Sequence, residues 1–139
     1  MAGCAGIGPR EAPESWRIWD LHCHMGSVVG KTPEERLVSL LTCADRLGIE
    51  RLVLHGGMKI GLGNPPPEQL SQDNDDCIRA IRYRPDRTLG FVYLNPNYLD
   101  FSLRELERCV RDGPMVGVKF LVARRANSPD HDPIVRRAG

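Results

Sequence analysis

The chain has 139 residues, of which 41% are hydrophobic and 27% are charged, and its formal net charge is +1. These values are typical of one globular domain, and they exclude the strongly basic surface that nucleic acids and anionic membranes attract. The sequence also lacks an apolar run of the roughly 20 residues that a membrane helix requires. We therefore expect a cytoplasmic protein without a nucleic-acid or membrane partner.

The first sixteen residues differ in composition from the rest of the chain. Segment 1–16 is rich in glycine, alanine and proline and has no apolar core preceded by positive charge, so it does not resemble a secretory signal. We expect a flexible leader there and one structural unit at 17–139. The five cysteines form no Cys-x-x-Cys pair, which indicates reduced thiols, and those in predicted helices are expected to be buried (Cys43, Cys77 and Cys109).

From residue 17 onward, short apolar runs alternate with segments whose apolar residues recur at helical spacing. Two capping boxes, Thr32 with Glu35 and Ser102 with Glu105, predict the starts of the first and third helices. This alternation requires parallel strands joined by right-handed crossovers, which is an α/β fold. The predicted strands are 17–23, 49–55, 88–94 and 115–121, a long loop covers 58–72, and the predicted helices begin at about 32, 73, 102 and 132.

The first predicted strand contains Asp20-Leu21-His22-Cys23-His24. Side chains alternate between faces along a strand, so Asp20, His22 and His24 are expected on the same face. Neutral imidazole is a common ligand of transition metals, and two imidazoles at this spacing can bind the same ion. The alternative is a pair of hydrogen-bonded histidines at a strand end. The neighbouring carboxylate and the glycine turn that follows favour a metal site.

This motif resembles the Asp-x-His-x-His signature on the first barrel strand of the amidohydrolase superfamily. The rest of the chain is similar to the amidohydrolase-related branch, which includes decarboxylases of the aminocarboxymuconate-semialdehyde type. The resemblance covers 17–139 and implies a partial (β/α)8 TIM barrel, about the first four β/α units of that fold. The other stretches that follow the pattern of the branch are 89–92 with Asn95-Pro96, 103–110, 116–119 and 132–134.

The resemblance also implies a function, namely metal-dependent hydrolysis or decarboxylation of a small carboxylate or amide-like substrate. His22 and His24 match the first two metal ligands of the family, and zinc is the expected divalent metal. The family's later ligands, two histidines and an aspartate that also serves as acid and base, have no counterpart here. A catalytic zinc needs about three protein ligands. We therefore assign no catalytic residue, and we expect this N-terminal half to bind zinc weakly and to be inactive alone.

Further candidates stand at the C-terminal ends of the predicted strands, where barrel enzymes place their sites. His55 and Asn95 are candidate substrate contacts, although His55 fits a solvent-facing position on the rim equally well. Lys119 resembles a position at which some superfamily members carboxylate a lysine to bridge two metals. We favour a contact between Lys119 and the substrate over ligation of a metal.

Two alternatives differ in kind from this interpretation. TatD-type metal-dependent nucleases open with the same motif, but they carry a glutamate ligand near the position that Lys119 occupies here. The other alternative is a truncated, non-catalytic product that associates with other chains. The sequence stops inside a predicted helix, and half a barrel would leave the edges of its first and fourth strands open. These edges predict self-association.

Overall fold

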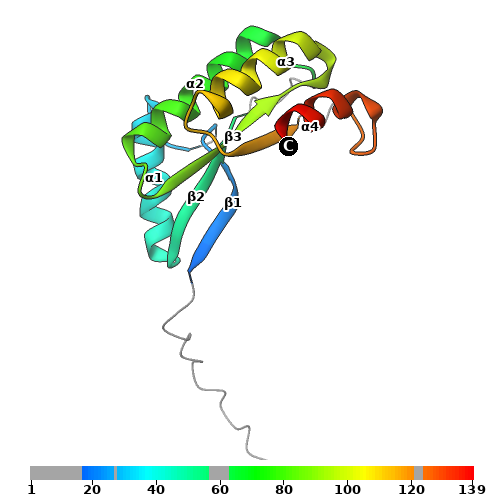
Figure 1. The fold of residues 1–139 in the computed structure, drawn as a ribbon. Helices are drawn as coiled ribbons and strands as arrows, with labels where there is room; N and C mark the ends of the chain where they lie inside the picture. Colours follow the sequence, from blue (N-terminus) through cyan, green and yellow to red (C-terminus); the bar gives the residue numbers. More distant parts are fainter. Residues whose placement is uncertain (1–16, 27, 57–62, 121–123) are drawn as a thin grey trace, which may run out of the picture.

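The computed structural model describes residues 17–26, 28–56, 63–120 and 124–139, so the expected leader and the first part of the expected 58–72 loop lie outside the described residues. Four parallel strands form a sheet in chain order, and α1, α2 and α3 lie along one side of it (Figure 1). The elements are β1 (Ile18–His24), α1 (Pro33–Arg46), β2 (Ile49–His55), α2 (Pro67–Tyr83), β3 (Thr88–Leu94), a 3-10 turn (Pro96–Tyr98), α3 (Leu99–Leu106), a π-helical turn (Glu107–Arg111), β4 (Gly117–Phe120), a second 3-10 turn (Pro129–His131) and α4 (Asp132–Ala138).

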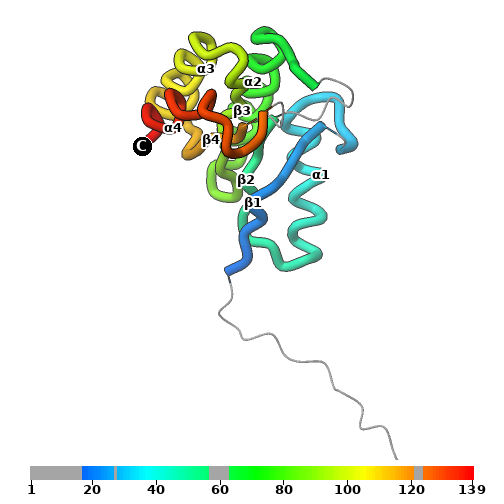
Figure 2. Tube along the Cα trace, turned by 90° about the vertical axis from the view of Figure 1, so that its right-hand side faces the viewer, coloured from blue at the N-terminus to red at the C-terminus, as the bar shows by residue number. Residues whose placement is uncertain are grey.

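The expected fold class is confirmed. Each strand pairs in parallel with the next along the chain, and the sheet curls into a half-barrel that contains the first four β/α units of a (β/α)8 barrel (Figure 2). The strands β2 and β3 have the predicted bounds. The strand β4 begins two residues later than predicted, because the amide of Met115 donates to the carbonyl of Cys109 and caps the preceding helical segment instead of joining the sheet. No helix of the described chain is both long and apolar enough to cross a membrane.

The capping box predicted for α1 is confirmed, whereas the second one is wrong. Oγ1 of Thr32 accepts a hydrogen bond from the amide of Glu35 at 3.2 Å, as expected of a helix N-cap. Ser102 instead lies inside α3, and its hydroxyl donates to the carbonyl of Asn95 at 2.8 Å. The side chain of Asn95 accepts from the amide of Asn97 at 3.0 Å and caps the 3-10 turn that leads into α3, so the helical segment begins before Ser102.

The helix α2 also begins earlier than expected, at Pro67 rather than near residue 73. Proline is well suited to the first helical position, because its fixed φ fits a helix and its missing N–H would have no partner there. Pro67 is therefore the first residue of α2, where we had expected a loop, whereas Pro65 and Pro66 lie before the helix as expected. The second half of the predicted 58–72 loop is helical.

The hydrophobic core fills the space between the helices and the sheet. Gly90 of β3 lies under α2, where a Cβ would come within 2.4 Å of Cδ1 of Ile81, so the helix packs directly against the strand backbone. Cys77 and Cys109 are buried in this core as predicted, but Cys43 is exposed, because it lies on the solvent side of α1. The largest fully buried core side chains include Leu37, Leu54, Leu94, Ile134 and Val92.

Near the C-terminal end of β3, the side chain of Asn74 in α2 forms the backbone hydrogen bonds that a neighbouring strand would otherwise form. The pairing of β2 with β3 runs only from Leu52 with Thr88 to Leu54 with Gly90. Beyond it, Oδ1 of Asn74 accepts from the amide of Tyr93 at 2.8 Å and Nδ2 of Asn74 donates to the carbonyl of Tyr93 at 3.1 Å. The buried amide thereby satisfies both backbone groups that a neighbouring strand would otherwise pair.

The amide of Asn74 is held in turn by a buried carboxylate on α3. Nδ2 of Asn74 also donates to Oε1 of Glu105 at 3.1 Å, and Arg108 donates to both oxygens of Glu105 at 2.9 and 2.6 Å. Burial raises the pKa of Glu105, but the hydrogen bonds from Arg108 and Asn74 outweigh it, so this pKa lies below its ordinary value of 4.5. The chain of contacts joins α3, α2 and β3.

We predict that Asn74→Ala lowers the free energy of unfolding by about 3 kcal/mol, because it leaves the buried backbone of Tyr93 and the carboxylate of Glu105 without this partner. Urea unfolding followed by circular dichroism measures the change. Gln72→Ala, which removes an exposed amide from the same helix, is the control and should change the stability by less than about 0.5 kcal/mol. Equal losses for both variants would show that the Asn74 amide does not stabilise β3.

We also predict a pH dependence of stability from Glu105. Its depressed pKa means that the folded state favours the carboxylate, so the stabilisation is present above pH 4.5 and is lost as the pH falls through the folded-state pKa. The gap in unfolding free energy between the wild type and Glu105→Gln should therefore shrink as the pH falls below 4.5. Urea unfolding at several pH values tests this, with exposed Glu68→Gln as the control. A gap that stays constant with pH contradicts the prediction.

Candidate metal centre

The strand β1 is irregular where its motif begins. Asp20 pairs with Leu52 and Cys23 pairs with Leu54, so three residues of β1 run beside two of β2. Oδ1 of Asp20 accepts a hydrogen bond from the amide of His22 at 2.9 Å within this step. The carboxylate therefore braces the backbone of its own strand, and it is not part of the group of convergent ligand atoms found in the described chain.

Three histidines converge at the C-terminal ends of β1 and β2. The ladder pairs His24 directly with His55, and their ring centroids are 4.1 Å apart. The ring of His22 lies 4.7 Å from that of His55, and its Nε2 is 3.2 Å from Nε2 of His24. One nitrogen from each ring lies within 4.8 Å of the other two, and within the described ranges no other set of three His, Cys, Asp or Glu side chains converges in this way.

The burial of this group fits a bound cation. His55 is only 1% exposed, and Nδ1 of His55 and Nδ1 of His24 are buried without a hydrogen-bond partner in the described part of the chain. Nitrogens that bind a tetrahedral zinc ion at about 2.0–2.1 Å are about 3.3 Å apart. The distance of 3.2 Å between Nε2 of His22 and Nε2 of His24 matches this spacing. The three histidines therefore fit a divalent metal.

The electrostatic environment keeps the inner two imidazoles neutral. Burial, followed by the nearby charges of His24 and Lys119, lowers the pKa of His55 to about 4. Burial also lowers the pKa of His24, followed by the charges of His22 and Lys119. Because a metal binds the unprotonated nitrogen of imidazole, both side chains are in the ligating form at neutral pH.

Lys119 approaches the histidines from the far edge of the half-barrel. Its Nζ lies 3.5 Å from Nε2 of His22, although β4 and β1 are the outermost strands of the sheet. The curl of the sheet thus brings an ammonium group beside the candidate metal site. The structure places Lys119 together with the two histidines of the motif.

The other two candidates, Asn95 and His55, lie at the C-terminal ends of β3 and β2. Asn95 is fully buried, and its Nδ2 donates to Oδ1 of Asn64 at 2.7 Å and to the carbonyl of Pro65 at 3.4 Å, so it holds the segment before α2 against the end of β3. His55 is buried rather than solvent-facing and lies within the histidine group. The signal that could have placed it there was its position at the end of the strand that follows β1, since adjacent parallel strands bring their ends together.

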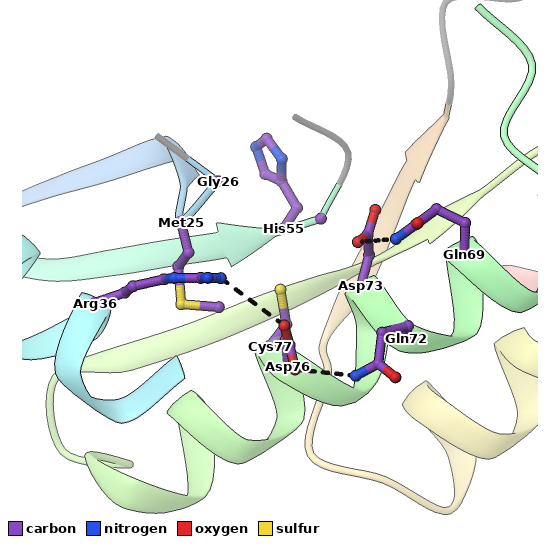
Figure 3. A pocket seen from close by; sticks show the side chains of 10 residues that line it. Met25, Gly26, Arg36, His55, Gln69, Gln72, Asp73, Asp76 and Cys77 are labelled. Carbon is purple, nitrogen blue, oxygen red and sulfur yellow. Dashed lines mark hydrogen bonds and ion pairs between the residues drawn. The ribbon is translucent and has the colours of Figure 1, made fainter. Parts of the chain in front are cut away.

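A cavity of about 240 Å³ adjoins the site on the other face of the sheet. In Figure 3 the ring of His55 projects to one side of β2, whereas Met25, Arg36 and Cys77 lie on the other side, among α1 and α2. Nη1 of Arg36 lies 4.0 Å from Oδ2 of Asp76, so the charges of the cavity wall partly neutralise each other. His55 is itself one of the residues that line this cavity, so the cavity borders the histidine group from the side of α1 and α2.

Among the comparisons with known proteins, the one with solved structures finds proteins of similar fold. No protein-family model and no curated protein matches the sequence. The fold is similar to the crystal structure of 2,6-dihydroxybenzoate decarboxylase complexed with 2,6-dihydroxybenzoate and to that of 2,6-dihydroxybenzoate decarboxylase from Rhizobium, each with a TM-score of 0.58 and 25% sequence identity. Each match covers 71% of this chain and 35% of the other, so this chain spans about a third of their length. The likeness supports the partial (β/α)8 barrel that the sequence indicates.

We predict that Lys119→Met tightens zinc binding about tenfold, because it removes a positive charge beside His22 that repels the cation. Isothermal titration of zinc into the metal-free chain measures the affinity, and Lys31→Met, an exposed lysine at the start of α1, is the control. A marked loss of affinity in Lys119→Met would contradict this prediction and would identify Lys119 as a ligand.

Proposed function

We propose that this chain is the metal-binding N-terminal part of a decarboxylase of the amidohydrolase superfamily that acts on a small carboxylate. The observation that carries the proposal is the convergence of His22 and His24 with the ammonium group of Lys119 at one end of a barrel sheet. The likeness to 2,6-dihydroxybenzoate decarboxylase supports the same reaction class.

The side chains have separate tasks in this proposal. His22 and His24 hold the divalent ion, which supplies a Lewis acid when it is bound. Lys119 binds the carboxylate of the substrate, because an ammonium group next to a metal favours an anion in the space between them. His22 is exposed, so the site is open toward the side of the sheet that carries Lys119.

Decarboxylation fits this set of residues better than hydrolysis does. Hydrolysis and decarboxylation can both use a bound metal, so the group beside the metal decides between them here. A positive charge at Lys119 suits the binding of a carboxylate that leaves as carbon dioxide. The same lysine in place of a glutamate makes the nuclease alternative a poor fit.

In this proposal the chain contributes only a part of the residues of an active site. Four strands provide half of the mouth of an eight-stranded barrel, and the chain spans 35% of the length of the decarboxylases that it is similar to. We therefore expect the 139-residue chain to bind metal and carboxylate without turnover. Self-association stays a prediction, which the exposed Trp19 and Leu21 on the outer strand β1 favour. The identity of the metal as zinc also stays a prediction.

We predict that the zinc-loaded chain binds 2,6-dihydroxybenzoate and that removal of the metal, or Lys119→Met, weakens this binding about tenfold. Isothermal titration measures the affinity, and Lys31→Met is again the matched control. Carbon dioxide release is followed in parallel and should stay at the level of the buffer.

Two outcomes contradict parts of this proposal. Binding that needs neither the metal nor Lys119, or that is equally strong for uncharged 2,6-dihydroxybenzamide, would exclude the carboxylate site. Release of carbon dioxide by the chain alone would show that its four strands suffice for turnover.

A further inference from the structure

We infer that His55 is a third protein ligand of the metal, so that the ends of β1 and β2 alone hold the ion through three imidazoles. This inference rests on the proposed metal site, but it changes the role of His55 from a substrate contact to a ligand. It also predicts how many ions each chain binds and which metals it selects.

The position of His55 in the sheet supports this assignment. His55 and His24 are paired residues of adjacent parallel strands, and their ring centroids are 4.1 Å apart. A nitrogen of His55 lies within 4.8 Å of a nitrogen of His22 and of His24, which is close enough for all three to bind one ion after small rotations of the rings. The backbone register thus places His55 next to the two histidines of the motif.

The surroundings of His55 argue against its other possible roles. A histidine that contacts substrate or solvent is accessible, whereas His55 is 1% exposed. A buried structural histidine normally has hydrogen-bond partners for its ring nitrogens, whereas Nδ1 of His55 has none in the described part of the chain. Its ring lies beside that of His22, with the ring centroids 4.7 Å apart, on the face on which His22 lies near Lys119. Ligation accounts for the burial and for the direction of the ring.

The composition of the set predicts its selectivity. Three neutral nitrogen ligands and an open position are typical of a catalytic zinc site. Imidazole favours zinc, cobalt, nickel and copper over magnesium and calcium, which prefer oxygen ligands. The ammonium group of Lys119 lies 3.5 Å from Nε2 of His22, where it opposes the binding of a second cation. We therefore expect one borderline transition metal per chain.

Cobalt(II) is the probe for this assignment, because its visible spectrum reports the number and type of ligands. The metal-free 139-residue chain should bind one cobalt ion with the intense bands of a four-coordinate site. His55→Ala should weaken cobalt binding more than about 100-fold, since even the loss of an outer-shell partner costs 10–100-fold. His55→Cys should keep the ion and add a sulfur-to-cobalt charge-transfer band in the near ultraviolet. His131→Ala, which removes a buried histidine outside the group, is the matched control and should bind cobalt as the wild type does.

The outcomes separate this inference from the proposed function. If His22→Ala abolishes cobalt binding while His55→Ala leaves it unchanged, or if His55→Cys binds cobalt without the charge-transfer band, His55 is not a ligand and the proposed function stands. If all three histidines are required for cobalt binding but the zinc-loaded chain does not bind the carboxylate, the ligand assignment stands and the proposed function fails. The Cys variant gives a positive signal, so the test does not depend on the stability of His55→Ala.

Discussion

The register between β1 and β2 is the constraint on which the candidate site depends. Parallel pairing places His24 beside His55. His22 lies two residues before His24 on the same strand, and its Nε2 is 3.2 Å from Nε2 of His24, a distance that suits a shared ion. Two adjacent strands are enough to bring the three rings together. The rest of the half-barrel contributes Lys119, which reaches His22 only because the sheet curls.

The irregular step in β1 is what keeps the histidines in phase with β2. The extra residue of β1 between Asp20 and Cys23 offsets the opposite shift between Ile18 and Trp19, so the strands are back in their starting register where His24 pairs with His55. The hydrogen bond from the amide of His22 to Asp20 stabilises this step. The acidic residue of the motif thus binds the backbone, whereas its two histidines converge with His55, although all three belong to one short signature.

The sequence was sufficient for the order of elements, the parallel sheet and the bounds of β2 and β3, because these follow from apolar runs and glycine turns near in sequence. It was insufficient where a distant partner decides the conformation. Ser102 has the sequence of an N-cap, but the carbonyl of Asn95 receives its hydroxyl and the helix begins earlier. Nothing in the sequence indicates that the side chain of Asn74 forms the hydrogen bonds of a neighbouring strand with the backbone of Tyr93. His55 was predicted at a strand end, yet its partners follow only from the lateral register of two strands.

The 3.5 Å separation between Nζ of Lys119 and Nε2 of His22 joins side chains of the two outer strands of the sheet. Charge at the site therefore acts on a contact between the first and the last strand. In the proposed function, a cation held by the histidines would repel this ammonium group and an anion between them would attract both, so binding at the site would be linked to the spacing of the outer strands.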